Sequence, residues 1–105
     1  MIDAGTAVVD LASVLADDGG AWASLDVART LARTFRVRRM KGVVAAWHVH
    51  EEADEGFLVL SGEMIVDLED RCRRLGPGEM TIVRAGLRHR ARVEGEALVL
   101  VFDAL

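Results

Sequence analysis

The sequence predicts an all-β protein, either a sandwich or a small barrel. Short apolar runs recur about every 8–12 residues, which is the spacing of strands in such folds. Within most runs apolar and polar side chains alternate, the period-two pattern of a strand. Glycine stands at nearly every break between runs, where tight turns favour it. We therefore expect roughly seven or eight short strands rather than the strand–helix alternation of a parallel sheet.

Length, composition and charge limit the classes of function. The 105 residues suffice for one domain with a single core. Hydrophobic residues make up 51% of the chain, which argues against a disordered protein. The formal net charge is −4, whereas nucleic-acid-binding domains concentrate basic charge. No apolar run approaches the roughly 18–20 residues that cross a bilayer. We expect a small-molecule ligand or substrate as partner, and neither nucleic acid nor a membrane.

Cysteine usage and the first residues indicate a cytoplasmic location. The single cysteine, Cys72, excludes an internal disulfide framework and fits a reducing compartment. The first three residues, Met-Ile-Asp, lack the basic region that opens a signal peptide. We expect a cytoplasmic protein in which Cys72 has no functional role.

The chain divides into an N-terminal part, residues 1–32, and a barrel, residues 33–105. Residues 6–18 predict a short amphipathic helix that Gly19 and Gly20 terminate. Its apolar side chains recur at helical spacing, at Val8, Leu11, Ala12 and Leu15. The following residues, 21–31, alternate weakly and are expected to form an edge strand.

The first barrel strands differ in how they are covered. In residues 33–41, Phe35 and Val37 alternate with Arg36 and Arg38, which predicts one buried and one solvated face. Residues 42–50 are apolar on both faces, and one of these faces carries Val44, Ala46, His48 and His50. A strand apolar on both sides is buried on both sides. With the similar run at residues 99–101, this predicts a homodimer.

The remaining strands follow from alternation and turn signals. We expect them over residues 57–61, 64–68, 72–75, 79–83, 89–93 and 97–102. The acidic stretch at residues 94–96 is expected to be a turn between the last two strands. Asp67 is expected at the surface.

Three histidines and one glutamate form a candidate metal site. His48 and His50 are two residues apart on a strand, so their imidazoles point the same way. Glu55 opens the next apolar strand, where an unpaired carboxylate facing a barrel interior would be costly. His89 shares a strand face with apolar residues and is expected to point inward. Imidazole nitrogens and a carboxylate oxygen suit a divalent metal, so we predict His48, His50, Glu55 and His89 as its ligands.

The spacing of these residues resembles the two motifs of the cupin superfamily. Gly42, His48, His50, Glu55 and Gly62 match the first motif without departure. The second motif resembles Gly78, Gly86 and His89, but Arg84 replaces its proline and Val93 an asparagine often found there. The first replacement loosens the turn before His89 and places Arg84 at the rim of the site.

This resemblance, over roughly residues 33–102, implies a jelly-roll β-barrel, the double-stranded β-helix, in a small single-domain cupin. Within the superfamily the chain resembles the conserved-barrel, mannose-6-phosphate-isomerase-like cupins.

The resemblance also bounds the activity. It implies a metal-dependent oxygenase, isomerase, lyase or decarboxylase acting on a small oxygenated or carboxylated metabolite, because cupins with this ligand set include all four. The ligand types do not select among Fe, Mn, Ni, Zn, Co and Cu. Glu55 is the plausible catalytic acid or base near the metal. Fold does not settle function, so a non-catalytic module that binds metal or a small molecule, or a dimer scaffold with a vestigial site, stays an alternative to an enzyme.

Overall fold

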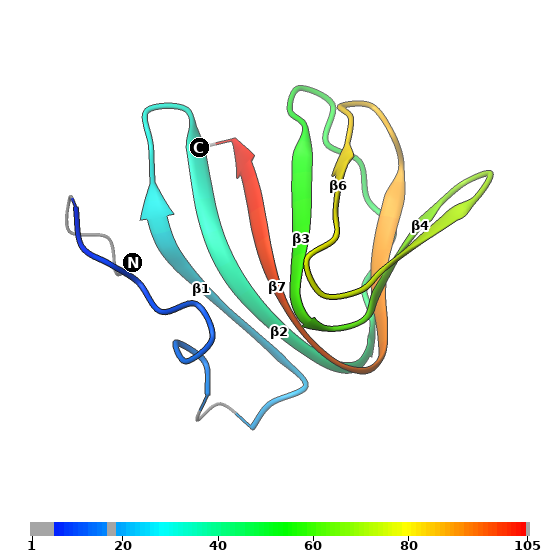
Figure 1. The fold of residues 1–105 in the computed structure, drawn as a ribbon. Helices are drawn as coiled ribbons and strands as arrows, with labels where there is room; N and C mark the ends of the chain where they lie inside the picture. Colours follow the sequence, from blue (N-terminus) through cyan, green and yellow to red (C-terminus); the bar gives the residue numbers. More distant parts are fainter. Residues whose placement is uncertain (1–5, 17–18, 105) are drawn as a thin grey trace.

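The computed structural model describes residues 6–16 and 19–104, which contain seven strands and no helix. Figure 1 shows most of the strands side by side in a strongly curved sheet, and all strand pairs are antiparallel. The all-β prediction is therefore confirmed. The strands are β1 (Trp22–Arg29), β2 (Arg33–Val44), β3 (Glu55–Gly62), β4 (Met64–Leu68), β5 (Cys72–Leu75), β6 (Met80–Val83) and β7 (His89–Ala104).

The long strand β7 connects the two halves of the barrel. Its C-terminal half lies in the order β1-β2-β7-β3-β6, and its N-terminal half pairs with β4, which pairs with β5. The predicted turn at residues 94–96 is wrong, because β7 runs through it without a break. Opposite these exposed residues, the register with β2 shifts between Lys41 and Val43. Such a bulge bends the strand pair without ending it, so the sheet curls at this point.

The core lies between the two halves of the barrel. Side chains from β3, β4 and β7 meet there, each at most 1% exposed: Phe57, Val59, Met64, Val66, Val99 and Val101. Burying an apolar side chain of this size contributes about 1.5–3 kcal/mol. These strands therefore form the rigid frame that holds the inward residues at their ends.

The predicted N-terminal helix is wrong over its described residues, and residues 17–18 of the prediction lie outside them. Residues 11–16 form turns. The carboxylate of Asp10 accepts a hydrogen bond from the backbone N–H of Ala12 at 3.1 Å. The backbone carbonyl of Asp10 accepts one from the N–H of Ser13 at 3.2 Å. These local bonds close single turns instead of a helical ladder. Val8 is 98% exposed, so no apolar stripe is buried to support a helix that is marginal in isolation.

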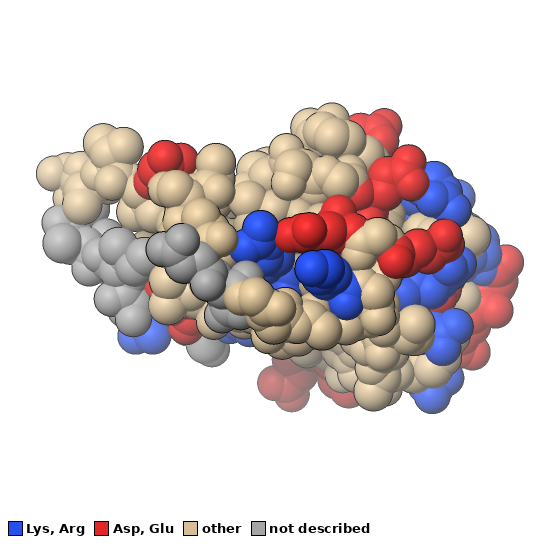
Figure 2. Space-filling model, turned by 90° about the horizontal axis from the view of Figure 1, so that it is seen from below, with Lys and Arg blue, Asp and Glu red and all other residues tan. Residues whose placement is uncertain are grey.

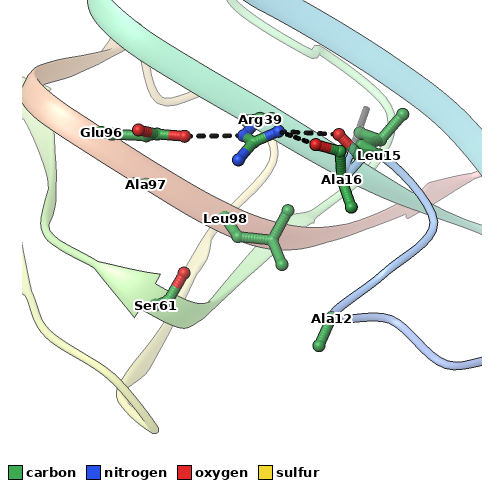
Figure 3. A pocket seen from close by; sticks show the side chains of 8 residues that line it. All are labelled: Ala12, Leu15, Ala16, Arg39, Ser61, Glu96, Ala97 and Leu98. Carbon is green, nitrogen blue, oxygen red and sulfur yellow. Dashed lines mark hydrogen bonds and ion pairs between the residues drawn. The ribbon is translucent and has the colours of Figure 1, made fainter. Parts of the chain in front are cut away.

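Arg39 of β2 holds the end of this N-terminal segment against the sheet. Its Nη1 donates to the backbone carbonyls of Leu15 at 2.8 Å and Ala16 at 3.2 Å, while its Nε pairs with Glu96 at 2.7 Å (Figure 3). These carbonyls are bonded to the sheet rather than to a following helical turn. The next segment forms β1, which lies at the edge of the sheet as predicted.

The faces of β2 differ from the prediction. Arg36 lies opposite Val101, and Arg38 lies opposite Val99. Directly paired residues share a face of the sheet, and both valines belong to the core. Arg36 and Arg38 therefore point into the barrel, and their assignment to a solvated face is wrong. Val37 on the other face is fully buried as well, so alternation alone does not reveal which face is the interior.

Asp67 ties β4 to the N-terminal half of β7. It is 8% exposed rather than a surface residue. Its Oδ2 accepts hydrogen bonds from Nε of Arg90 at 2.9 Å and from Nε of Arg92 at 2.8 Å. Burial by itself raises the pKa of Asp67, but the hydrogen bonds and charges of the two arginines outweigh it, so the pKa lies below its ordinary value.

Replacing Asp67 with asparagine is expected to destabilise the protein by about 1–3 kcal/mol at pH 7, because two partly buried arginine donors lose a charged acceptor. A carboxylate with a lowered folded-state pKa stabilises the fold above its unfolded-state pKa of about 3.9 and loses this effect as the pH falls through the folded value. The difference from wild type should therefore shrink below about pH 4. Urea unfolding between pH 3 and 7 checks this, with Glu63→Gln at an exposed ion pair as control. A constant difference over that range contradicts the assignment.

Charges of both signs alternate on the outer surface. Figure 2 shows Lys and Arg lying beside Asp and Glu on the face seen there, without a large patch of one sign. Ion pairs such as Arg74–Glu63 at 2.7 Å and Arg92–Glu94 at 3.2 Å account for part of this mixing. No helix in residues 6–16 and 19–104 is long and apolar enough to cross a membrane.

Candidate metal centre

The position of His48 depends on one extra residue after the end of β2. Val44 pairs with Arg92, whereas His48 pairs with His89, so four residues on one side match three on the other. Val44 is consequently on the outer face, 63% exposed, while His48 shares the inner face with His89. The predicted common face of Val44 and His48 is therefore wrong, but His48 does point inward. Two backbone hydrogen bonds of 2.9 Å join His48 to His89 and fix this register.

The loops beyond the strands place the other two side chains. Glu55 is the first residue of β3 and lies opposite Val83 of β6, on the same inward face as Phe57. The backbone carbonyl of His50 accepts a hydrogen bond from the N–H of Gly86 at 2.8 Å, which ties the loop after β2 to the loop before β7. The structure thus brings together all four predicted site residues.

The three imidazoles converge on one carboxylate oxygen. Oε1 of Glu55 lies 3.0 Å from Nε2 of His89, 3.4 Å from Nε2 of His50 and 3.7 Å from Nε2 of His48. One ligand atom from each side chain lies within 4.8 Å of the other three. The cluster is buried at one side and open at the other: Glu55 and His89 side chains are 6% and 1% exposed, but His48 and His50 are each 40% exposed. A small molecule can therefore approach from the side of His48 and His50.

Backbone carbonyls determine which nitrogens face the centre. Nδ1 of His89 lies 2.8 Å from the carbonyl oxygen of Leu87, and Nδ1 of His48 lies 3.1 Å from that of Ala46. A carbonyl only accepts, so each Nδ1 carries the proton and each Nε2 of the neutral ring has a free lone pair. A hydrogen bond of this kind also orients metal-binding histidines.

The free lone pairs of these rings indicate whether the cluster is suited to a metal ion. In the neutral ring, Nε2 of His89 and the ionised Glu55 would be two acceptors only 3.0 Å apart. Nε2 of His50 is buried without a hydrogen-bond partner. A cation among the four side chains satisfies all these acceptors at once, and three nitrogens with one oxygen are a common donor set for transition metals. The cluster could hold a divalent metal ion and would leave further coordination positions for a ligand.

Arg84 lies at the rim of the site and not among the four clustered residues. Its Nη1 pairs with Oδ2 of Asp54 at 3.2 Å, and Oδ1 of the same carboxylate accepts the N–H of Ala85 at 2.9 Å. The backbone hydrogen bond from Ala85 is the main cause that holds the pKa of Asp54 below its ordinary value, and Arg84 adds to it. Asp54 directly precedes Glu55, so this contact joins the loop before β7 to the start of β3. Arg84 is 71% exposed and does not reach the histidines through any contact found in the described residues.

The fold and the site together define a small antiparallel β-barrel protein with a His₃Glu cluster at its open end. A model of the cupin domain matches residues 35–104, and the chain belongs to this family.

Solved structures give the same fold. A cupin-2 domain-containing protein from Shewanella frigidimarina superposes with a TM-score of 0.84 at 22% identity, covering 90% of this chain and 92% of that one. KdgF from Halomonas sp. superposes with a TM-score of 0.73 at 28% identity, covering 84% of this chain and 82% of that one. The DMSP lyase DddQ from Ruegeria pomeroyi gives 0.70 at 25% identity, covering 86% of this chain and 50% of that one. No curated protein matches the chain.

Proposed function

We propose that the protein is a metal-dependent enzyme that acts on a small oxygenated or carboxylated metabolite, with His48, His50, Glu55 and His89 as the metal ligands. The single observation that carries this proposal is the convergence of three histidine Nε2 atoms on Oε1 of Glu55 at 3.0–3.7 Å, on the open side of the barrel. The metal identity is left among Fe, Mn, Ni, Zn, Co and Cu, because nitrogen and oxygen donors select weakly among them.

The chain's own residues have distinct roles in this proposal. When bound, the metal supplies Lewis acidity toward a substrate oxygen. His89 and Glu55, both buried, fix the centre, and the half-exposed His48 and His50 border the approach of the substrate. Glu55 is also the proposed acid or base, because among the described residues it is the only carboxylate within the cluster. As a base, Glu55 would take up the proton on a carboxylate oxygen that does not coordinate the metal at that moment, adjacent to the reacting molecule.

The likeness to structural neighbours suggests where to begin a substrate screen. Oxygenase, isomerase, lyase and decarboxylase reactions are all compatible with the proposal. The 25% identity to a DMSP lyase favours lyase reactions as the first to be screened. A fold supports many activities, so this choice only orders the screen.

Elemental analysis of protein purified without an affinity tag or added metal tests the proposal. We expect about one transition-metal ion per chain, as a single four-ligand site would hold, and turnover of a small metabolite by the metal-loaded protein. Absence of any metal above background, even after incubation with each candidate ion, would overturn the site. A loaded protein that binds small molecules without turning them over would instead support the alternative, a non-catalytic binding module.

We also propose that the protein is a cytoplasmic homodimer. Large apolar side chains are exposed around the barrel, among them Val44 at 63%, Val49 at 38% and Met80 at 54%. The exposed free thiol of Cys72 suits a reducing compartment. Sedimentation at micromolar concentration is expected to give twice the 11.4 kDa chain mass. A species of 11.4 kDa alone would contradict the dimer.

A further inference from the structure

Two arginines of β2 enter the barrel but differ in their partners. Arg36 is neutralised, because its Nε lies 3.3 Å from Oδ1 of Asp26 and its Nη2 lies 3.6 Å from Oδ1 of Asp103. In the described part of the chain Arg38 has no such carboxylate; its Nε, like that of Arg36, is buried without a hydrogen-bond partner. Its guanidinium rests on the ring of Trp22, with Cζ at 4.7 Å from the ring centroid. Arg38 is thus an inward cation whose hydrogen-bond donors are incompletely used.

An unpaired inward guanidinium is costly for the fold. Burial lowers the pKa of Arg38, whereas the nearby Glu55 carboxylate raises it; Arg36 lowers it further and Asp103 raises it. An arginine nevertheless stays charged in proteins. The contact with Trp22 is a cation–π interaction, which stabilises the charge but offers no hydrogen-bond acceptor to Nε. Charge that is desolvated without a matching partner is typical of a binding site.

Arg38 and the candidate metal centre face the same interior of the barrel. Glu55 and Arg38 are on the inward faces of β3 and β2, which flank the C-terminal half of β7. Glu55 is near enough for its charge to act on Arg38. Nevertheless, no ion pair or hydrogen bond joins them in the described residues. A molecule bound at the four ligands could therefore extend toward a guanidinium that no protein carboxylate occupies.

We propose that Arg38 binds a carboxylate of the substrate, at a distance from the group that meets the metal. This inference rests on the proposed function and names its substrate class: a small acid with an oxygen-bearing head and a separate carboxylate. Guanidinium and carboxylate match as planar, bidentate partners. The charges near the site are those of Arg36 and Arg38 against Asp26, Asp103 and Glu55. These sum to −1, and a bound divalent metal would bring the sum to +1, which favours a singly charged carboxylate over a dianionic phosphate.

Binding of a matched set of acids to the Zn²⁺-loaded protein tests the proposal. The probes are the 2-hydroxy diacids malate, 2-hydroxyglutarate and 2-hydroxyadipate, each compared by calorimetry with the 2-hydroxy monoacid of equal chain length, and with inorganic phosphate. At least one diacid is expected to bind wild type at least about tenfold more tightly than its monoacid, since a charged hydrogen-bonded pair contributes about 1.5–3 kcal/mol. Arg38→Gln should abolish this preference and Arg38→Lys should retain part of it. Arg73→Gln, an exposed arginine of β5, should leave it unchanged.

Zn²⁺ titration and melting temperature separate the possible failures. If Arg38→Gln binds Zn²⁺ as wild type does and melts no lower, Arg38 is not a structural residue, and loss of the diacid preference supports the proposal. Equal binding of diacids and monoacids by wild type, no binding of either, or tighter binding of phosphate would overturn it while the metal site stands. Failure of wild type to bind Zn²⁺ would overturn the proposed function itself.

Discussion

Replacing His48 or His89 with alanine is expected to weaken Zn²⁺ binding by more than about tenfold. Loss of an outer partner of a metal ligand already costs about 10–100-fold in affinity, so loss of a ligand should cost at least as much. In both residues Nε2 lies within 3.7 Å of the same carboxylate oxygen, so each is expected to supply its own bond to the metal. Competition titration against a chelating dye measures the affinity. Glu55→Gln is expected to weaken binding as well, because it removes the negative charge from the centre.

Controls separate loss of a ligand from loss of the fold. His89 is 1% exposed, so its replacement also leaves a cavity and lowers stability. His48 is 40% exposed, so His48→Ala should unfold at nearly the wild-type temperature in the absence of metal. Glu52→Gln removes an exposed carboxylate three residues before Glu55 and should bind Zn²⁺ unchanged. An affinity within tenfold of wild type for both His48→Ala and His89→Ala would contradict the ligand assignment.

The four residues of the centre could be predicted together because their information is local. His48 and His50 are two residues apart, and Glu55 begins an apolar strand after a polar break. His89 precedes an alternating run whose even positions carry arginines, so its face could be predicted. Each inference needs only the period of a strand, and the resemblance to a known pair of motifs supplied the long-range pairing. The structure places all four within 4.8 Å of one another.

The direction of β2 side chains could not be predicted in the same way. Phe35 and Val37 made the odd face of the strand look like the interior, but Arg36 and Arg38 lie opposite core valines of β7. Both faces of this strand are partly covered, and two register shifts against β7, one after Lys41 and one after Val44, reverse the parity of the inward residues and then restore it before His48. A bulge is a tertiary feature with a weak sequence signal. The inward arginines, and hence the further site, therefore became visible only in the structure.

In the N-terminal segment, a helical spacing of apolar residues predicted a helix that the structure does not contain in its described residues. Apolar residues at helical spacing predict a helix only if another surface covers them, and here Val8 is exposed while Arg39 of the sheet bonds the carbonyls of Leu15 and Ala16. The predicted turn at residues 94–96 is wrong for a related reason. Acidic residues and a glycine suggest a chain reversal, but they also suit an exposed bend in a continuous strand that is paired on its neighbouring side.

Replacing Gly62 with alanine is expected to destabilise the metal-free protein by about 2–4 kcal/mol. Gly62 joins β3 to β4 with a φ of 76°, where a Cβ costs about 1–2 kcal/mol. A Cβ there would also collide with the backbone carbonyl oxygen of Glu96 in β7, which cannot move as a side chain would. Gly78→Ala is the matched control, because its φ is 81° but open space surrounds it.

Urea unfolding of the two variants without metal separates strain from collision, because bound metal would stabilise the folded state by mass action. In Gly78→Ala the free energy of unfolding should fall only by the cost of the strained backbone conformation. In Gly62→Ala it should fall clearly more. Equal losses would mean that the close approach of Gly62 to β7 contributes nothing. A larger loss at Gly62 would show that this contact holds the corner where the two halves of the barrel meet.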